Sequence, residues 1–227
     1  MRLAAVVQAR MGSRRLPGKV LAPIAGTPLL GHLLDRLDRC RAVDRVIVAT
    51  SSEPSDDPVA AYCAARGATV RRGPLRDVAA RIAAVIDAEA LDGFVRVCAD
   101  SPLLDPGLVD AAARMLRATG VDVVTNARPR THPHGQSVEA VRADAFRRAL
   151  GLMTEPGDRE HVTPALYRHP ERFSIAPLPA DREWPAVGLA VDTPEDLARI
   201  AAVVARMTRP PSDYGLAEIV ALAAGTR

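Results

Sequence analysis

The feature that most constrains this chain is a stretch near its amino terminus where an apolar run changes abruptly into a cationic loop. Residues 3–7 are apolar, and the segment from Val7 to Lys19 (VQARMGSRRLPGK) then carries two glycines, a serine, three arginines and a lysine. A buried parallel strand that ends at a ligand-binding edge has this pattern. Successive backbone N–H groups can surround phosphate oxygens, and Gly12 and Gly18 permit a close approach. The stretch therefore predicts a phosphate-binding loop after a first strand.

This loop differs from two common phosphate motifs. Gly12 and Gly18 are separated by five residues instead of the four of a Walker A motif, and Val20 stands where that motif has a Ser or Thr for magnesium. The dinucleotide fingerprint G-x-G-x-x-G is absent from the loop. We therefore expect a phosphate-binding loop of another kind.

Lys19 is the only lysine among the 30 basic residues of the chain. Lysine and arginine are not interchangeable at phosphates, because the ammonium is a compact point charge and the guanidinium is a planar fork. A functional role for Lys19 is one interpretation, and a single lysine left at an exposed position is the other. The cationic loop around it favours function.

Composition excludes several classes of protein. The net charge of +3 over 227 residues is too balanced for a nucleic-acid binder, and no basic run with interleaved aromatic residues occurs. The three cysteines lack metal spacing, which is typical of free thiols in a reducing compartment. No apolar segment approaches 18 residues, and no signal peptide precedes the first strand. We expect a cytoplasmic protein with no membrane and no nucleic-acid partner.

Hydrophobic periodicity predicts an α/β fold. Strands are expected over 45–50, 68–71, 94–98 and 121–125, and helices over 28–40, 59–66, 76–90 and 106–119. This alternation implies βαβ units and a parallel sheet. A Pro-rich polar loop over 126–136 changes the pattern. It is followed by strands over 137–141, 172–178 and 184–191, and by helices over 143–150, from about 161 to 168, from 194 onward and from about 213 onward. No linker interrupts residues 1–227, so one domain is expected.

Two aspartates follow predicted strands. Asp100 lies in VRVCADSP and Asp192 in GLAVDTPEDL. Ligands of open α/β sheets bind at the carboxyl ends of strands, and a few carboxylates together with substrate phosphates commonly hold Mg²⁺. Each aspartate can instead be a local cap of the following turn or helix. The scarce amides Gln8, Asn126 and Gln136 also lie near predicted strand ends, where they can read a polar ligand or be ordinary turn residues.

Together these segments resemble a known family. The sequence VQARMGSRRLPGKVL is similar to the first motif of the cytidylyltransferases that activate sugar acids, such as the CMP-Kdo and CMP-sialate synthetases. RVCADSPLLDP, HGQSVEAV, GDREHVTPALYRHPERF and LAVDTPEDL extend the resemblance in order along the chain, and resemble most the branch named for spore-coat polysaccharide biosynthesis. The segment Gly73-Pro74-Leu75-Arg76-Asp77-Val78 departs from the family pattern of Gly-Ser followed by two acidic residues and Val.

The resemblance implies a three-layer α/β/α nucleotidyltransferase sandwich with a mostly parallel sheet and a small dimerisation lobe, in which 126–180 supplies the lobe and the acceptor-side loops. It implies Mg²⁺-dependent transfer of CMP from CTP to a sugar acid or another small acid with release of pyrophosphate, in a homodimer. The implied catalytic residues are Arg10, Lys19 and Asp100, and the implied Mg²⁺ ligands are Asp100 and Asp192. The implied nucleotide-binding residues are Gln8, Ala9, Arg10, Gly12, Ser13, Arg15, Lys19 and Arg81. The implied acceptor-binding residues are His134, Gln136, Glu139, Arg159, Glu160 and His161.

Two alternatives remain at this stage. A glycosyltransferase that uses a nucleotide-sugar donor has a related fold, but Asp100-Ser101-Pro102 lacks the second aspartate of its usual Asp-x-Asp motif. A non-catalytic nucleotide-binding protein is the other alternative, and the cationic loop with both aspartates argues against it.

Overall fold

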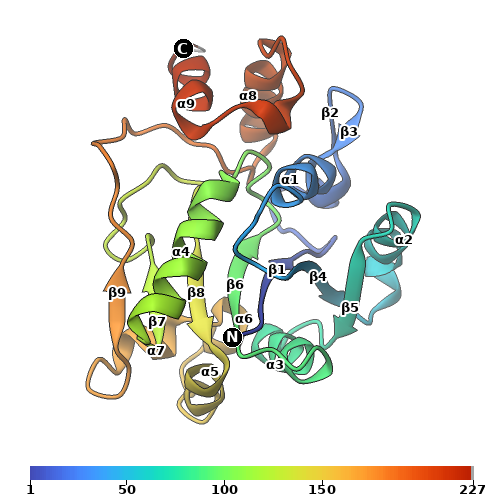
Figure 1. The fold of residues 1–227 in the computed structure, drawn as a ribbon. Helices are drawn as coiled ribbons and strands as arrows, with labels where there is room; N and C mark the ends of the chain where they lie inside the picture. The colour runs from blue at the N-terminus through green and yellow to red at the C-terminus, as the bar shows by residue number, and fades with distance from the viewer. Residues whose placement is uncertain (226–227) are drawn as a thin grey trace.

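A computed structural model describes residues 1–225, and its centre is a seven-stranded sheet (Figure 1). Four strands at one side are parallel: β5 (Thr69–Gly73), β4 (Arg45–Ser51), β1 (Leu3–Gln8) and β6 (Gly93–Cys98), in that spatial order. β8 (Glu139–Arg142) is antiparallel to both of its neighbours, and β7 (Val123–Thr125) and β9 (Ile175–Pro177) complete the sheet. The predicted mostly parallel sheet is confirmed.

Helices cover both faces of the sheet, which gives three layers. α1 (Leu29–Leu37), α2 (Asp57–Ala65) and α4 (Pro106–Thr119) pack on one face, and α1 and α4 lie in front of the sheet in Figure 1. α3 (Val78–Ala88), α5 (Ala143–Leu150) and α7 (Pro164–Arg168) pack on the other. The strands feed both layers because successive side chains alternate: in β1, Ala5 and Val7 join the first core and Ala4 and Val6 the second.

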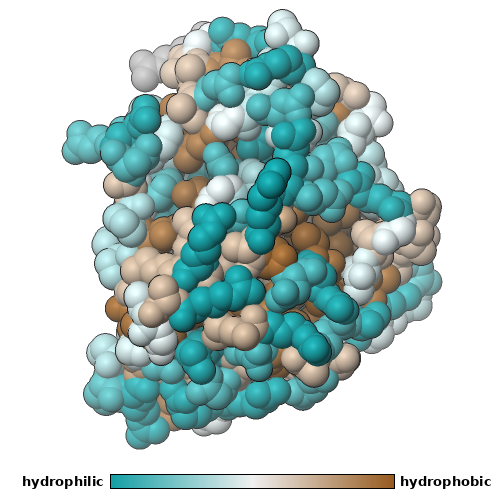
Figure 2. Space-filling model, viewed as in Figure 1, coloured by the Kyte–Doolittle hydropathy of each residue, from teal (hydrophilic) through white to brown (hydrophobic). Residues whose placement is uncertain are grey.

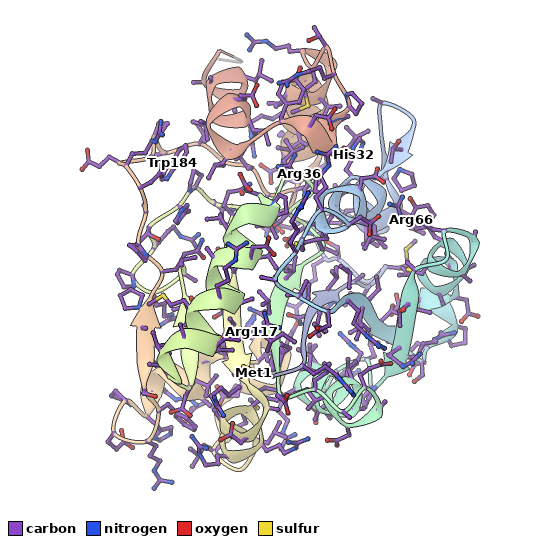
Figure 3. The ribbon with its side chains drawn as sticks, viewed as in Figure 1. Met1, His32, Arg36, Arg66, Arg117 and Trp184 are labelled. Carbon is purple, nitrogen blue, oxygen red and sulfur yellow. The ribbon has the colours of Figure 1, made fainter. Side chains whose placement is uncertain are left out.

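A third apolar cluster lies beside one end of the sheet. It joins α8 (Pro194–Ala205), α9 (Leu216–Ala224) and the hairpin of β2 (Pro23–Ile24) and β3 (Thr27–Pro28). Arg36 of α1 connects this cluster to the main body (Figure 3). Its fully buried guanidinium donates to the carbonyl oxygens of Leu104 (2.7 Å), Pro211 (2.7 Å) and Tyr214 (2.9 Å). These bonds fix the C-terminal helices against α1 and the turn before α4.

Two predicted elements are wrong. The expected strand over 184–191 forms only one β-bridge, between Gly188 and His134. The helix expected to run to residue 168 is divided into α6 (Asp158–His161) and α7, because Val162 between them has a φ of 74°. A β-branched residue rarely adopts that conformation, so the chain turns sharply there.

The surface in Figure 2 is mostly hydrophilic, and among residues 1–225 Met1 is the one large hydrophobic side chain that is exposed. No helix in the described part of the chain is long and apolar enough to cross a membrane. The assignment of 126–180 to a small lobe and acceptor-side loops stays a prediction, and residues 226–227 of the predicted domain lie outside the described part.

Candidate functional site

A cavity of about 400 Å³ opens at the carboxyl ends of β1 and β6. Ligands of open α/β sheets bind at this edge, and the volume is in the range of small-molecule sites. The lining residues come from the end of β1 and the segment after it through residue 20, from α3, from β6 and the turn after it, from α6 and from the segment before α8. They are Gln8, Ala9, Arg10, Gly12, Ser13, Arg14, Arg15, Lys19, Val20, Val78, Arg81, Arg96, Cys98, Ala99, Asp100, Glu160, His161 and Asp192.

The loop after β1 has the form of an anion-binding loop. The backbone N–H groups of Gly12, Arg14 and Arg15 have no hydrogen-bond partner in the described part of the chain. Gly18 has a φ of 75°, which requires glycine to turn the chain into the short 3₁₀ helix η1 (Lys19–Leu21). Unpaired N–H groups that face a cavity are suited to phosphate oxygens.

Asp56 holds this loop in place. Its fully buried carboxylate accepts the backbone N–H of Met11 (2.6 Å) and the hydroxyl of Ser51 at the end of β4. Residues 51–57, between the predicted strand and the predicted helix, were given no role from the sequence. A carboxylate that follows a buried strand is the signal that could have indicated it.

Lys19 brings the two predicted metal ligands together. Its Nζ donates to the Val191 carbonyl (2.6 Å) and to Asp192 Oδ1 (2.8 Å), and it lies 3.5 Å from Asp100 Oδ2. Arg15 Nη2 lies 3.0 Å from the other oxygen of Asp192. The amino-terminal loop and two aspartates that are far apart in the sequence therefore share one charged cluster.

Neither aspartate is a local helix cap. The N-cap of α4 is Asp105, which accepts the N–H of Gly107, and the N-cap of α8 is Thr193, which forms a capping box with Asp196. Capping of the following helix is thus wrong for both aspartates; within its own turn the Asp100 carboxylate accepts the Ser101 hydroxyl (3.1 Å). Partial burial favours the protonated form of Asp192, but the hydrogen bond and charge of Lys19 outweigh it, so the pKa of the Asp192 carboxyl lies below its usual value.

The opposite wall of the cavity carries a second charged pair. Arg10 Nη2 donates to Glu160 Oε1 of α6 (2.6 Å), and this bond lowers the pKa of the Glu160 carboxyl. Arg81 of α3 is buried, and its Nη1 donates to the Pro74 carbonyl (2.7 Å) while its Nε has no partner among residues 1–225. Burial lowers the pKa of the Arg81 guanidinium, and the charge of Arg10 acts in the same direction. His161 completes this wall.

The floor contains residues that the sequence analysis did not find. Arg96 and Cys98 of β6 line it together with Gln8, whose Oε1 accepts from Arg96 Nε. Burial raises the pKa of the Cys98 thiol to about 11, so the sulfur is protonated at neutral pH. An arginine inside the apolar strand FVRVC is the sequence signal that could have indicated this floor.

Several predicted acceptor-binding residues do not line this cavity. Gln136 is fully buried, and its amide accepts the Asp105 N–H and donates to the Leu103 carbonyl, both at 2.8 Å. Arg159 pairs with Asp77 (2.9 Å) outside the cavity. Exposed His134 lies in a neighbouring groove, and Glu139 is buried behind Arg96. Of the six residues, the structure brings Glu160 and His161 to the cavity.

The residues present suit a hard divalent cation. No group of three or more His, Cys, Asp or Glu side chains that could hold a metal occurs among the described residues. Mg²⁺ needs fewer protein ligands, because it is commonly held by one or two carboxylates and by substrate phosphates. Asp100 and Asp192 already contact one cation, the Lys19 ammonium, at the edge where phosphates would lie.

Comparison with known proteins gives a consistent result. A family model described as cytidylyltransferase matches residues 4–210. The spore coat polysaccharide biosynthesis protein SpsF of Bacillus subtilis is 32% identical over 96% of this chain and 92% of its own. The 3-deoxy-manno-octulosonate cytidylyltransferase of an Anaeromyxobacter species is 31% identical over 90% of this chain and 97% of its own. The solved structure of a cytidylyltransferase from Leptospira borgpetersenii has a TM-score of 0.93 at 27% identity and covers 99% of this chain and 94% of that one.

Proposed function

The chain belongs to the cytidylyltransferase family, and from this premise we propose that it transfers CMP from CTP to a small acid, with Mg²⁺ as cofactor and release of pyrophosphate. The observation that carries the proposal is the contact of one ammonium, that of Lys19, with the carboxylates of both Asp192 and Asp100. The two aspartates and the cationic loop thereby form a single site for a charged triphosphate.

The triphosphate binds along the loop after β1. The unpaired N–H groups of Gly12, Arg14 and Arg15 donate to phosphate oxygens, and Lys19 and Arg10 supply positive charge from two sides. Arg10 and Arg15 leave their present partners, Glu160 and Asp192, for the phosphates. Arg15 is exposed and Arg10 is partly exposed, so solvent screens both ion pairs and their exchange costs little.

Asp100 and Asp192 would hold Mg²⁺ together with the phosphates. When bound, the ion neutralises charge that develops on the phosphate oxygens. The low pKa of Asp192 keeps its carboxyl ionised and ready to bind the ion at neutral pH. Lys19 stays next to both carboxylates and limits their mutual repulsion.

The reaction is an in-line substitution. An oxygen of the acceptor forms a bond to the α-phosphorus of CTP, the bond to the bridging oxygen breaks, and pyrophosphate leaves with both electrons of that bond. This chemistry needs positioning and charge neutralisation more than covalent work by the protein. Lys19 and Arg10 stabilise the leaving group, and the cavity between α3 and α6 positions the base and the acceptor.

The test is a pyrophosphate-release assay. Purified protein is incubated with each of the four nucleoside triphosphates, with and without Mg²⁺, and with a panel of small acids that includes 3-deoxy-manno-octulosonate. We expect release that depends on CTP, on Mg²⁺ and on one class of acid. Arg147→Ala, which removes only an exposed ion pair with Asp87, is the matched control and keeps wild-type activity. Release with all four nucleotides alike, or none with any acid, contradicts the proposal.

A further inference from the structure

Arg96 has no role in the proposed chemistry at phosphorus, although its side chain lines the cavity. It lies inside β6, two residues and so about 7 Å before the end of the strand. Asp100 follows the end of the same strand. Arg96 is therefore set deeper in the cavity than the metal-binding and phosphate-binding groups, where a different part of a ligand would lie.

Three side chains fix the orientation of Arg96. Its Nε donates to Gln8 Oε1, and its Nη1 donates to Glu139 Oε2 (2.5 Å). Glu139 is directly opposite Arg96 on the antiparallel strand β8, so the ion pair is also a cross-strand pair. The hydroxyl of Tyr167 donates to the other oxygen of Glu139 (2.5 Å). Burial lowers the pKa of the Arg96 guanidinium, but the negative charges that Cys98 at high pH and Glu139 carry beside it, together with the hydrogen bond to Glu139, raise this pKa above its usual value, so Arg96 is charged at neutral pH.

One edge of this guanidinium remains free. A guanidinium has five N–H donors, and the terminal nitrogen Nη2 has no hydrogen-bond partner in the part of the chain that the structure describes. The Arg96 side chain keeps 16% of its surface exposed, and the cavity is the space that it lines. Because Glu139 balances the charge, the free edge recognises a ligand through directed N–H donors more than through net charge.

We propose that Arg96 is a specificity-determining residue that donates from Nη2 to an oxygen of the bound substrate, and that Glu139, Gln8 and Tyr167 position it; this rests on the proposed function. The oxygen belongs to the carbonyl edge of the pyrimidine base or to the carboxylate of the acceptor. Both are planar acceptors that a guanidinium binds well. Cytosine presents O2 and N3 as neighbouring acceptors for the two N–H bonds of Nη2, whereas uracil has the same O2 but an N–H at position 3. A base contact that uses O2 and N3 together would therefore discriminate between CTP and UTP.

The experiment compares two variants that differ only at position 96. Glu139→Gln keeps Arg96 and serves as the reference, and the double variant Arg96→Gln with Glu139→Gln removes the guanidinium without leaving a buried carboxylate unpaired. Thermal unfolding of both variants checks that they fold. If the double variant does not fold, Arg96→Lys replaces it, with wild type as the reference, because it keeps the ion pair and removes the planar fork.

Two readouts distinguish the sources of the oxygen. Titration calorimetry gives the dissociation constants of CTP and UTP without acceptor, and pyrophosphate release gives the KM of the best acid of the panel. If the base supplies the oxygen, we expect the dissociation constant of CTP to rise at least fivefold and that of UTP to stay unchanged. If the acceptor supplies it, we expect only the KM of the acceptor to rise at least fivefold. A smaller change in all three quantities overturns the proposal. If wild type releases no pyrophosphate with any acid, the proposed function fails, and a CTP constant unchanged within fivefold then overturns the role of Arg96 separately.

Discussion

Replacement of Lys19 by alanine tests the central cluster. The substitution removes an ammonium that is 14% exposed, bonded to Val191 and Asp192, and near Asp100. It leaves two carboxylates without the cation between them. We expect turnover to fall at least ~100-fold, equal to about 2.7 kcal/mol of transition-state stabilisation, the size seen when one charge-stabilising donor is lost.

We expect Lys19→Ala also to lower the thermal stability of the protein. The lost charge-assisted hydrogen bond is worth about 1.5–3 kcal/mol, and 1 kcal/mol shifts the midpoint of a domain of this size by about 2–4 °C. The lowered pKa of Asp192 stabilises the folded protein above the usual carboxyl pKa of about 3.9, and this contribution is lost as pH falls through the lower folded value. The difference in unfolding midpoint between wild type and Lys19→Ala is therefore largest near neutral pH and smaller below pH 4.

The assay is pyrophosphate release at saturating CTP and Mg²⁺, combined with scanning calorimetry at pH 7 and at acid pH. Lys19→Arg is the informative partner, because it keeps the charge but replaces the compact ammonium by a larger fork; we expect activity between that of wild type and Lys19→Ala. Turnover of Lys19→Ala within tenfold of wild type would refute the assignment of Lys19 to the triphosphate.

Three further predictions follow from single contacts. Asp100→Ala lowers turnover at least ~100-fold in the pyrophosphate assay while CTP still binds to the loop; near wild-type release contradicts its role as a metal ligand. Thr193→Ala removes the capping box beside Asp192, and calorimetry should give a loss of about 1 kcal/mol and a midpoint about 2–4 °C lower; an unchanged midpoint contradicts the cap. Burial raises the pKa of the Cys98 thiol to about 11, so iodoacetamide should alkylate this thiol at pH 8 roughly 100-fold more slowly in native protein than in denatured protein. The rate in native protein should rise toward pH 11. Equal alkylation rates of the two forms, measured by mass spectrometry, contradict the raised pKa.

Much of the fold follows from periodicity in the sequence. The strands of the seven-stranded sheet through residue 125 and the helices between them were predicted within a few residues, and the helices Pro106–Thr119 and Ala143–Leu150 at their observed bounds. The short hairpin of β2 and β3 was not predicted. These segments have one clear period and a Pro, Gly or Asp at their ends. Pro164 also carried a usable signal that we missed, because the residue before a proline is disfavoured in a helix, and proline favours the first turn of a new one.

The segment from Trp184 to Val191 shows where apolar character misleads. Its side chains at Trp184, Val187, Leu189 and Val191 are partly or fully buried, but they pack in the cluster of α8 and α9 instead of pairing in the sheet, and Pro185 and Ala186 are exposed. Pro185 has no N–H for a ladder, and Gly188 makes the one bridge. A short apolar run identifies burial, and the partner that buries it is decided by tertiary structure.

The candidate site also has a part that the sequence predicts and a part that depends on tertiary structure. The cationic loop after β1 was predictable because its glycines and cations fall within one short stretch, and Asp100 was predictable because it follows β6 at the carboxyl edge of the sheet. Asp192 was assigned to the same edge through the predicted strand over 184–191, which does not form. What brings Asp192 to Lys19 is backbone pairing: the Val191 N–H donates to the Asp100 carbonyl and the Leu189 N–H to the His134 carbonyl, both at 2.8 Å. Any residue can form backbone hydrogen bonds of this kind, so they leave no signal in the sequence. The sequence could therefore suggest that Asp192 lies near Lys19 but could not establish it. Gln136 shows the opposite outcome. From the sequence its amide was expected to bind the acceptor, but in the structure it is hydrogen-bonded to the backbone of the turn before α4. A polar residue near a strand end therefore predicts function only after the backbone groups around it have been assigned their own partners.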